Sequence, residues 1–265
     1  MTKPDKTAAA EPVKAPGTAI VSWKDKMALV QAQAAASEAP KGGFLSFKGG
    51  NISYNDDLIP GNNLGVIVID FLLENGMFRN KYNPNKPAAP MCYAFGRTED
   101  ELKPHPDCEE SQHTQCGISG QDGCCPNNEW GSDPDGGRGK ACKNSRRIGI
   151  ISADMLGQTD TLERIQKSSV VMCKLPVTSI VNFSRYVNQV VKAMETVPFA
   201  VTTELSTKPH PASLFQVHWK VTDEIRDQAT LEALFAKRES FQKQLHLPYP
   251  KFEEEEQSAK KSGKY

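Results

Sequence analysis

The stretch CCPNNEWGSDPDGGRGKACKNSRR, residues 124–147, together with the segment before it, most restricts how this chain can fold. Residues 96–141 show neither helical nor strand periodicity, and so long a gap inside a compact domain is usually functional or disordered. Five of the seven cysteines fall between residues 108 and 142. Because this segment has almost no apolar side chains, a bound metal ion would give it a reason to be ordered.

The rest of the sequence indicates a reducing compartment. The sequence contains no run of about 18 apolar residues, so no membrane span is predicted. The N-terminal stretch MTKPDKTAAAEPVKAPG lacks the apolar core of a secretory signal. We therefore expect a cytoplasmic protein with no membrane partner. In such a compartment, clustered cysteines are more often metal ligands than disulfides.

A zinc site needs four thiolate or imidazole ligands at about 2.0–2.3 Å. Adjacent Cys124 and Cys125 cannot easily both bind one ion, so one of them is expected to be a bystander. His105 and His113 are spare candidates, and a set of free thiols in a surface loop is the alternative. The pattern H-x-E…P-C-x-x-C of zinc deaminases is absent, which favours structural over catalytic zinc. The candidate ligands are Cys92, Cys108, Cys116, Cys125 and Cys142.

The same loop favours nucleic-acid binding, although 32 basic and 32 acidic residues balance over the whole chain. Cations interleaved with glycines permit close approach to phosphates, and neighbouring aromatic rings offer stacking surfaces for bases. An ordinary solvated cationic loop is the alternative. The candidate DNA-binding residues are Arg79, Lys81, Tyr82, Trp130, Arg138, Lys140, Lys143, Arg146 and Arg147.

No motif asks for an enzyme. The nucleophile elbow G-x-S-x-G, the zinc motif H-E-x-x-H, the dinucleotide motif G-x-G-x-x-G and the P-loop are all absent. We therefore expect neither catalysis nor a small-molecule substrate.

Outside the loop, the patterns predict strands and three helices. A helix beginning at Ser22 is followed by a hairpin (44–47 and 52–54), and the apolar run 65–73 predicts a buried strand. Asn75–Gly76 is typical of a tight turn. Further strands are expected at 91–95, 146–152, 168–175, 199–205 and 215–221, with a helix after Pro176 and another through Leu231 and Leu245. This order favours a strand-rich α+β domain, most simply a small barrel.

Several of these stretches together resemble a known family. CPNNEWGS…GRGKACKNSRRIGII, with APMCY (89–93), LPVTSIVNFSRYV (175–187) and PFAVTTELS (198–206), is similar to motifs of bacteriophage-encoded single-stranded DNA-binding proteins. The resemblance covers roughly residues 44–222. It implies an OB-like barrel with flanking helices and an inserted zinc loop, acting in the cytoplasm of a host cell.

The resemblance also implies the metal ligands, whereas the two ends of the chain are interpreted from their composition. Cys92, Cys116, Cys125 and Cys142 match the family's cysteines, while the wide spacing between Cys116 and Cys125 leaves Cys108 as a substitute for Cys92. We expect a disordered arm (1–20), a DNA-binding domain (21–250) with its insertion at about 96–145, and a charged tail (251–265). The expected partners are single-stranded DNA and, through the tail, replication proteins. A zinc-stabilised protein that regulates host RNA polymerase is the alternative function. The tail residues assigned to partner binding are Lys260, Lys261, Lys264 and Tyr265.

Overall fold

The computed structural model describes residues 43–79, 89–109, 116 and 124–249. The chain divides into two compact units, Met1–Lys41 and Gly42–Tyr265, and all described residues belong to the second unit. The expected arm (1–20), the helix beginning at Ser22 and the tail (251–265) lie outside the described residues.

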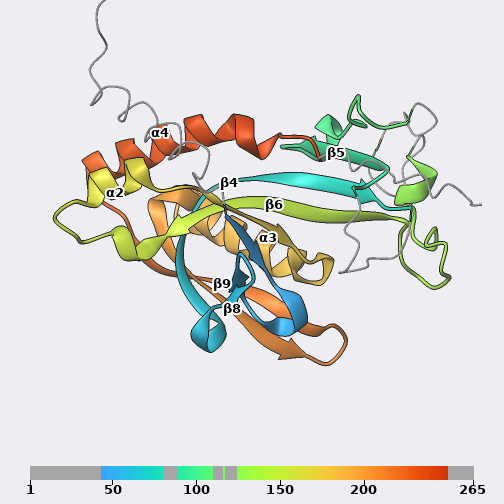
Figure 1. Cartoon of the computed structure of the whole chain (residues 1–265), viewed down its shortest axis with the longest axis horizontal. Helices are drawn as coiled ribbons and strands as arrows, with labels where there is room; N and C mark the ends of the chain where they lie inside the picture. The colour runs from blue at the N-terminus through green and yellow to red at the C-terminus, as the bar shows by residue number, and fades with distance from the viewer. Residues whose placement is uncertain (1–42, 80–88, 110–115, 117–123, 250–265) are drawn as a thin grey trace, which may run out of the picture. The chain divides into compact units, whose positions relative to one another are not determined.

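The described residues form one nine-stranded sheet (Figure 1). Its order is β3-β2-β1-β7-β6-β4-β8-β9, and β5 pairs with β4 beside this path. Only β1 and β7 pair in parallel among these strands. The strands are β1 (Phe44–Ser46), β2 (Ser53–Tyr54), β3 (Asp57–Leu58), β4 (Asn63–Met77), β5 (Cys92–Gly96), β6 (Cys142–Ser152), β7 (Val171–Leu175), β8 (Val201–His210) and β9 (Leu214–Glu224).

Strand β4 is the central strand of the sheet. It pairs with β6 along its length, with β8 at its beginning and with β5 at its end. Its apolar run Val66–Ile69 is buried on both faces, as expected of a strand covered on two sides. The predicted tight turn at Asn75–Gly76 is wrong, because both residues lie inside β4 and pair with Asn144 and Lys143 of β6. Long-range pairing with β6 overrides the local turn preference.

Helices cover both faces of the sheet. They are α2 (Thr161–Lys167), α3 (Ile180–Asn188), which continues into a π-helical turn (Gln189–Ala193), and α4 (Gln228–Leu245). Phe183 and Tyr186 of α3 pack inside the curled half of the sheet, against Trp219 of β9. Leu234 and Phe241 of α4 pack on the opposite face. No helix within the described ranges is long and apolar enough to cross a membrane.

At Val217, side chains from the segment around the start of α3 satisfy the backbone groups on the outer edge of β9. Ser179 accepts a hydrogen bond from the backbone N–H of Val217, and Asn182 donates to the carbonyl of the same residue. Thr207 of β8 donates to the carbonyl of Gly50, which ends the 3₁₀ turn η1 (Lys48–Gly50) on the far side of the curl. The strand-rich α+β class is therefore confirmed, with a sheet curled into a half-barrel.

We expect Gly149→Ala to destabilise the protein by about 1–3 kcal/mol, the usual range for overpacking. A Cβ atom at Gly149 of β6 would lie 2.1 Å from the Phe241 ring of α4, so the helix would have to move away from the sheet. Urea denaturation measures the loss. Gly65→Ala is the matched control, because its Cβ would meet only the Cβ of Ala153, at an ordinary 3.5 Å. Equal stabilities of the two variants would contradict this packing.

Candidate metal centre and nucleic-acid interface

Two cysteines begin neighbouring strands and point to one face of the sheet. Cys92 of β5 and Cys142 of β6 both pair with Met77, from opposite sides of β4. Directly paired residues share a face. The sheet therefore places two thiols on either side of the Met77 side chain, although 49 positions in the sequence separate them.

The segment between β5 and β6 adds two more cysteines, Cys116 and Cys125, to this pair. Cys92, Cys142, Cys116 and Cys125 line one cavity of about 10 Å³, which has room for a single atom-sized sphere. These are the four cysteines that the family resemblance implies. Cys108 does not line the cavity; it is buried nearby, where its sulfur accepts a hydrogen bond from the backbone N–H of Tyr93 at 3.2 Å.

The chemistry of this cavity fits a soft cation. All seven cysteines are described and none forms a disulfide. Burial and then neighbouring thiols raise the pKa of Cys116 to about 12 and that of Cys142 to about 11. Thiolates in this space therefore need a positive charge beside them. Among the described residues, no three Cys, His, Asp or Glu side chains are already spaced as ligands of one ion, so the sulfurs would have to close in around it.

Cys124 contributes differently. Its thiol lies 3.7 Å from the carbonyl oxygens of both Cys116 and Cys125, and it does not line the cavity. Cys124 therefore does not belong to the group of four cysteines around the cavity.

The basic loop projects an aromatic ring and cations into solvent beyond the cavity. Trp130 is 72% exposed, and Lys140 Nζ lies 5.1 Å from the centre of its ring. Arg138 is exposed near the tip, while Lys143 is tied to Asp133 at 2.7 Å. The loop is closed by a backbone hydrogen bond from Gly131 N–H to the carbonyl of Gly139. A firmly held loop thus presents an indole beside positive charge.

Arg147 is not part of this surface. Its side chain lies on the same face of β6 as that of Lys143 but farther along the strand, where its residue is 7% exposed and its Nε lies 3.0 Å from Glu74 Oε2. Its Nη1 donates to the carbonyls of Leu245 and Leu247 after α4. The predicted DNA contact of Arg147 does not fit this placement: Glu74 holds the side chain on the face of the sheet that α4 covers, where it joins the sheet to α4.

The other predicted DNA-binding residues are scattered. Arg146 is half-buried beside Leu73 and Leu175 on the neighbouring strands, and burial lowers its pKa. Arg79 is exposed and forms an ion pair of 2.7 Å with Glu109. Lys81, Tyr82 and the tail residues lie outside the described residues. The structure thus brings together Trp130, Arg138, Lys140 and Lys143.

Sequence reasoning missed a buried charged network beneath the end of α4. Glu74, 1% exposed, accepts hydrogen bonds from Arg147, Lys174 and Tyr249. The Arg147 guanidinium lies 4.1 Å from the centre of the Phe95 ring. Glu74 and Asp70 are acidic residues inside a largely apolar strand, and that was the available signal. This network holds α4 and the segment after it against the sheet.

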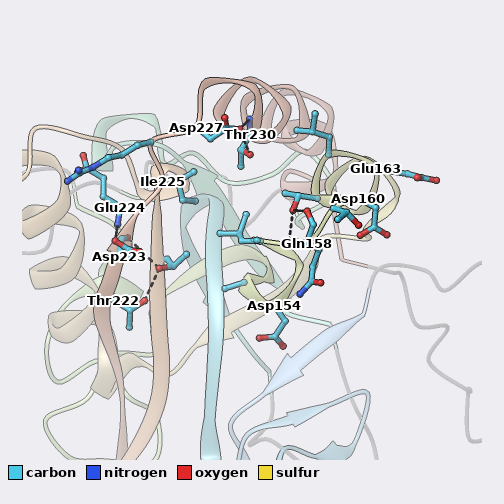
Figure 2. A pocket seen from close by; sticks show the side chains of 18 residues that line it. Asp154, Gln158, Asp160, Glu163, Thr222, Asp223, Glu224, Ile225, Asp227 and Thr230 are labelled. Carbon is cyan, nitrogen blue, oxygen red and sulfur yellow. Dashed lines mark hydrogen bonds and ion pairs between the residues drawn. The ribbon is translucent and has the colours of Figure 1, made fainter.

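A large acidic cavity lies at the other end of β6. It has a volume of about 980 Å³ between the start of α4, the end of β9 and the turn before α2. Figure 2 shows carboxylates around it from Asp154, Asp160, Glu163, Asp223, Glu224 and Asp227. Asp227 also caps α4, because its carboxylate accepts from the backbone N–H of Thr230 at 2.8 Å. This concentration of negative charge repels phosphates.

Comparisons with known proteins do not indicate a function, so the functional argument depends on the geometry of the site. No protein-family model, curated protein or solved structure matched the chain. What the basic loop offers chemically is sequence-tolerant: an indole face accepts any base, and ammonium or guanidinium groups neutralise any phosphate.

Proposed function

We propose that this chain is a non-enzymatic, single-stranded DNA-binding protein of a bacteriophage. The observation that carries the proposal is the Trp130 indole, 72% exposed and flanked by Lys140 at 5.1 Å. Single strands are held by exposed aromatic rings beside cations, and Trp130 with Lys140 forms such a pair. Arg138 is a second, exposed cation on the loop, and Lys143, which is paired with Asp133, lies where the loop enters β6.

The fold supports the same proposal. The half-barrel is compatible with an OB-like barrel, in which the segment between β5 and β6 is the inserted loop. Barrels of this type bind oligonucleotides along strands and the loops between them. The roles that follow are protection of single strands during phage replication, recombination or transcription.

We propose that zinc serves as the structural staple of this loop. Cys92, Cys116, Cys125 and Cys142 would be its ligands, and Cys108 is the nearest substitute for Cys92. A structural zinc ion binds tightly enough to survive purification. Elemental analysis should therefore find close to one zinc per chain, and less than about half would contradict a structural site.

The direct test is fluorescence anisotropy with oligothymidylate and with a duplex of equal length. We expect tighter binding to the single strand, and an affinity that falls as salt rises because phosphate contacts release counterions. Removing Arg138 by Arg138→Gln should reduce the slope of log affinity against log salt by about one. Equal affinity for both nucleic acids, or no salt dependence, would overturn the proposal.

A protein-interaction module that regulates host RNA polymerase predicts another outcome. It would show no preference for single strands, and it would capture host polymerase in the absence of DNA. Deleting residues 252–265 would then abolish capture, because the tail is the expected contact.

A further inference from the structure

A buried amide donor faces the cysteine cavity without a partner. Asn75 of β4 is 3% exposed and lines the cavity with the four cysteines. Its Nδ2 has no hydrogen-bond acceptor in the described part of the chain. An unsatisfied buried donor costs about 1–3 kcal/mol. A metal-bound thiolate would satisfy it, since outer-shell donors commonly orient metal ligands.

The other end of the Asn75 side chain begins a line of hydrogen bonds. Asn75 Oδ1 accepts from Asn144 Nδ2 at 2.6 Å, and the same Nδ2 donates to Asn128 Oδ1 at 3.1 Å. Each amide nitrogen carries two hydrogens, so one group serves both acceptors. Asn75 and Asn144 are directly paired across β4 and β6, which fixes this first step in the sheet.

Asn128 is the junction between the cavity and the basic loop. It is 3% exposed, and its Nδ2 donates to the carbonyl of Cys116 at 3.3 Å. Its Oδ1 also accepts from Lys140 Nζ at 3.3 Å, and Lys140 is the cation beside the Trp130 ring. Displacement of Cys116 or Asn75 on metal binding therefore reaches Lys140 through groups already in contact.

We infer that Asn75, Asn144 and Asn128 form a bridge that couples occupation of the cysteine cavity by a metal ion to DNA binding at Lys140 and Trp130. The inference rests on the proposed function and adds a thermodynamic link between its two sites. Zinc orders the bridge, and the bridge holds Lys140 where a phosphate beside a stacked base would lie. By linkage, each ligand then raises the affinity for the other by the same factor.

The test is a thermodynamic cycle on the full chain. Zinc affinity is measured by competition with a chromogenic chelator, with and without saturating oligothymidylate of about 16 nucleotides, the upper footprint of one OB fold. DNA affinity is measured by anisotropy with and without zinc. We expect both affinities to rise by the same factor, about tenfold, within the usual range for coupled sites.

Asn144→Leu should lower the coupling factor clearly, because only the route from Cys116 through Asn128 to Lys140 then remains, while leaving zinc affinity in the absence of DNA nearly unchanged. Asn75→Leu should weaken zinc binding about 10–100-fold, as expected for loss of an outer-shell donor, and should shift the thiolate charge-transfer band of the cobalt-loaded protein. Asn182→Leu is the matched control, because Asn182 donates to Gln216 and Val217 away from the cavity and should keep the coupling.

Three outcomes overturn the bridge. The first is a wild-type protein that binds zinc and DNA independently, and the second is full coupling in Asn144→Leu; both leave the proposed function intact. The third is a wild-type protein that fails to bind either ligand, which removes the proposed function as well. Because Asn144 is only half-buried, its variant tests the bridge even where the buried Asn75→Leu change unfolds the chain.

Discussion

Glu74→Gln is expected to lower the free energy of unfolding by about 3–5 kcal/mol at pH 7, the usual cost of removing one partner from a buried ion pair. Glu74 is 1% exposed. Its carboxylate lies 2.5 Å from Lys174 Nζ and 3.0 Å from Arg147 Nε. A neutral amide would leave both cations without their counter-charge. Urea denaturation followed by circular dichroism measures the loss.

The same substitution has a defined dependence on pH. Burial by itself would raise the pKa of Glu74, but Lys174 and Arg147 outweigh it and hold the pKa below the ordinary 4.5. A carboxyl whose pKa is depressed by folding stabilises the protein above its unfolded pKa, and this contribution is lost as the pH falls through the folded value. The gap between wild type and Glu74→Gln should therefore be widest near pH 7 and narrow below about pH 4.5.

Glu163→Gln is the matched control for this prediction. Glu163 and Lys167 form an exposed pair one turn apart on α2. Such pairs contribute about 0.3–0.5 kcal/mol. If Glu74→Gln were no more destabilised than Glu163→Gln, the buried network would not hold α4 to the sheet.

Strands with one wet face were predictable, because their alternation is local. The predicted strands near 199–205 and 215–221 correspond to β8 and β9, and the apolar run 65–73 lies inside β4. The beginning of β6 was not predictable, since Lys143, Asn144 and Ser145 are all polar. Those residues become a strand because the end of β4 supplies partners that lie about seventy positions earlier in the chain.

The sequence predicted which residues make up the candidate site, but not which of their side chains face solvent. Clustered cysteines and the family resemblance give the four that line the cavity. The basic run, however, does not show which of its members reach solvent. Side chains alternate along a strand, so Lys143 and Arg147 share a face of β6 and Arg146 takes the other. Only the position of Glu74 across the sheet explains why Arg147 is buried.

The largest expected effect on function is that of Trp130→Ala. Stacking of one base on an aromatic ring contributes about 1–3 kcal/mol, so the Kd for oligothymidylate should rise by roughly 5–150-fold. Stability should be unchanged, because the ring is 72% exposed. Anisotropy titration and thermal unfolding on the same sample separate the two effects. Trp130→Phe should recover most of the affinity, since it keeps an aromatic face.

Phe235→Ala is the control for loss of an exposed ring. Phe235 lies on α4, is 47% exposed, and is far in the sequence from the cysteine loop. Its removal should therefore change the Kd by no more than about twofold, which is less than the effect of losing one stacked base. A Trp130→Ala protein that bound single strands as tightly as wild type would show that the indole is not a stacking surface. The exposed cations would then carry binding alone, and the salt dependence of Lys140→Gln would be the next measurement, because the loss of one phosphate contact lowers the slope by about one. If the indole does stack on a base in the wild-type protein, by contrast, Trp130→Ala lowers the affinity at every salt concentration without changing that slope.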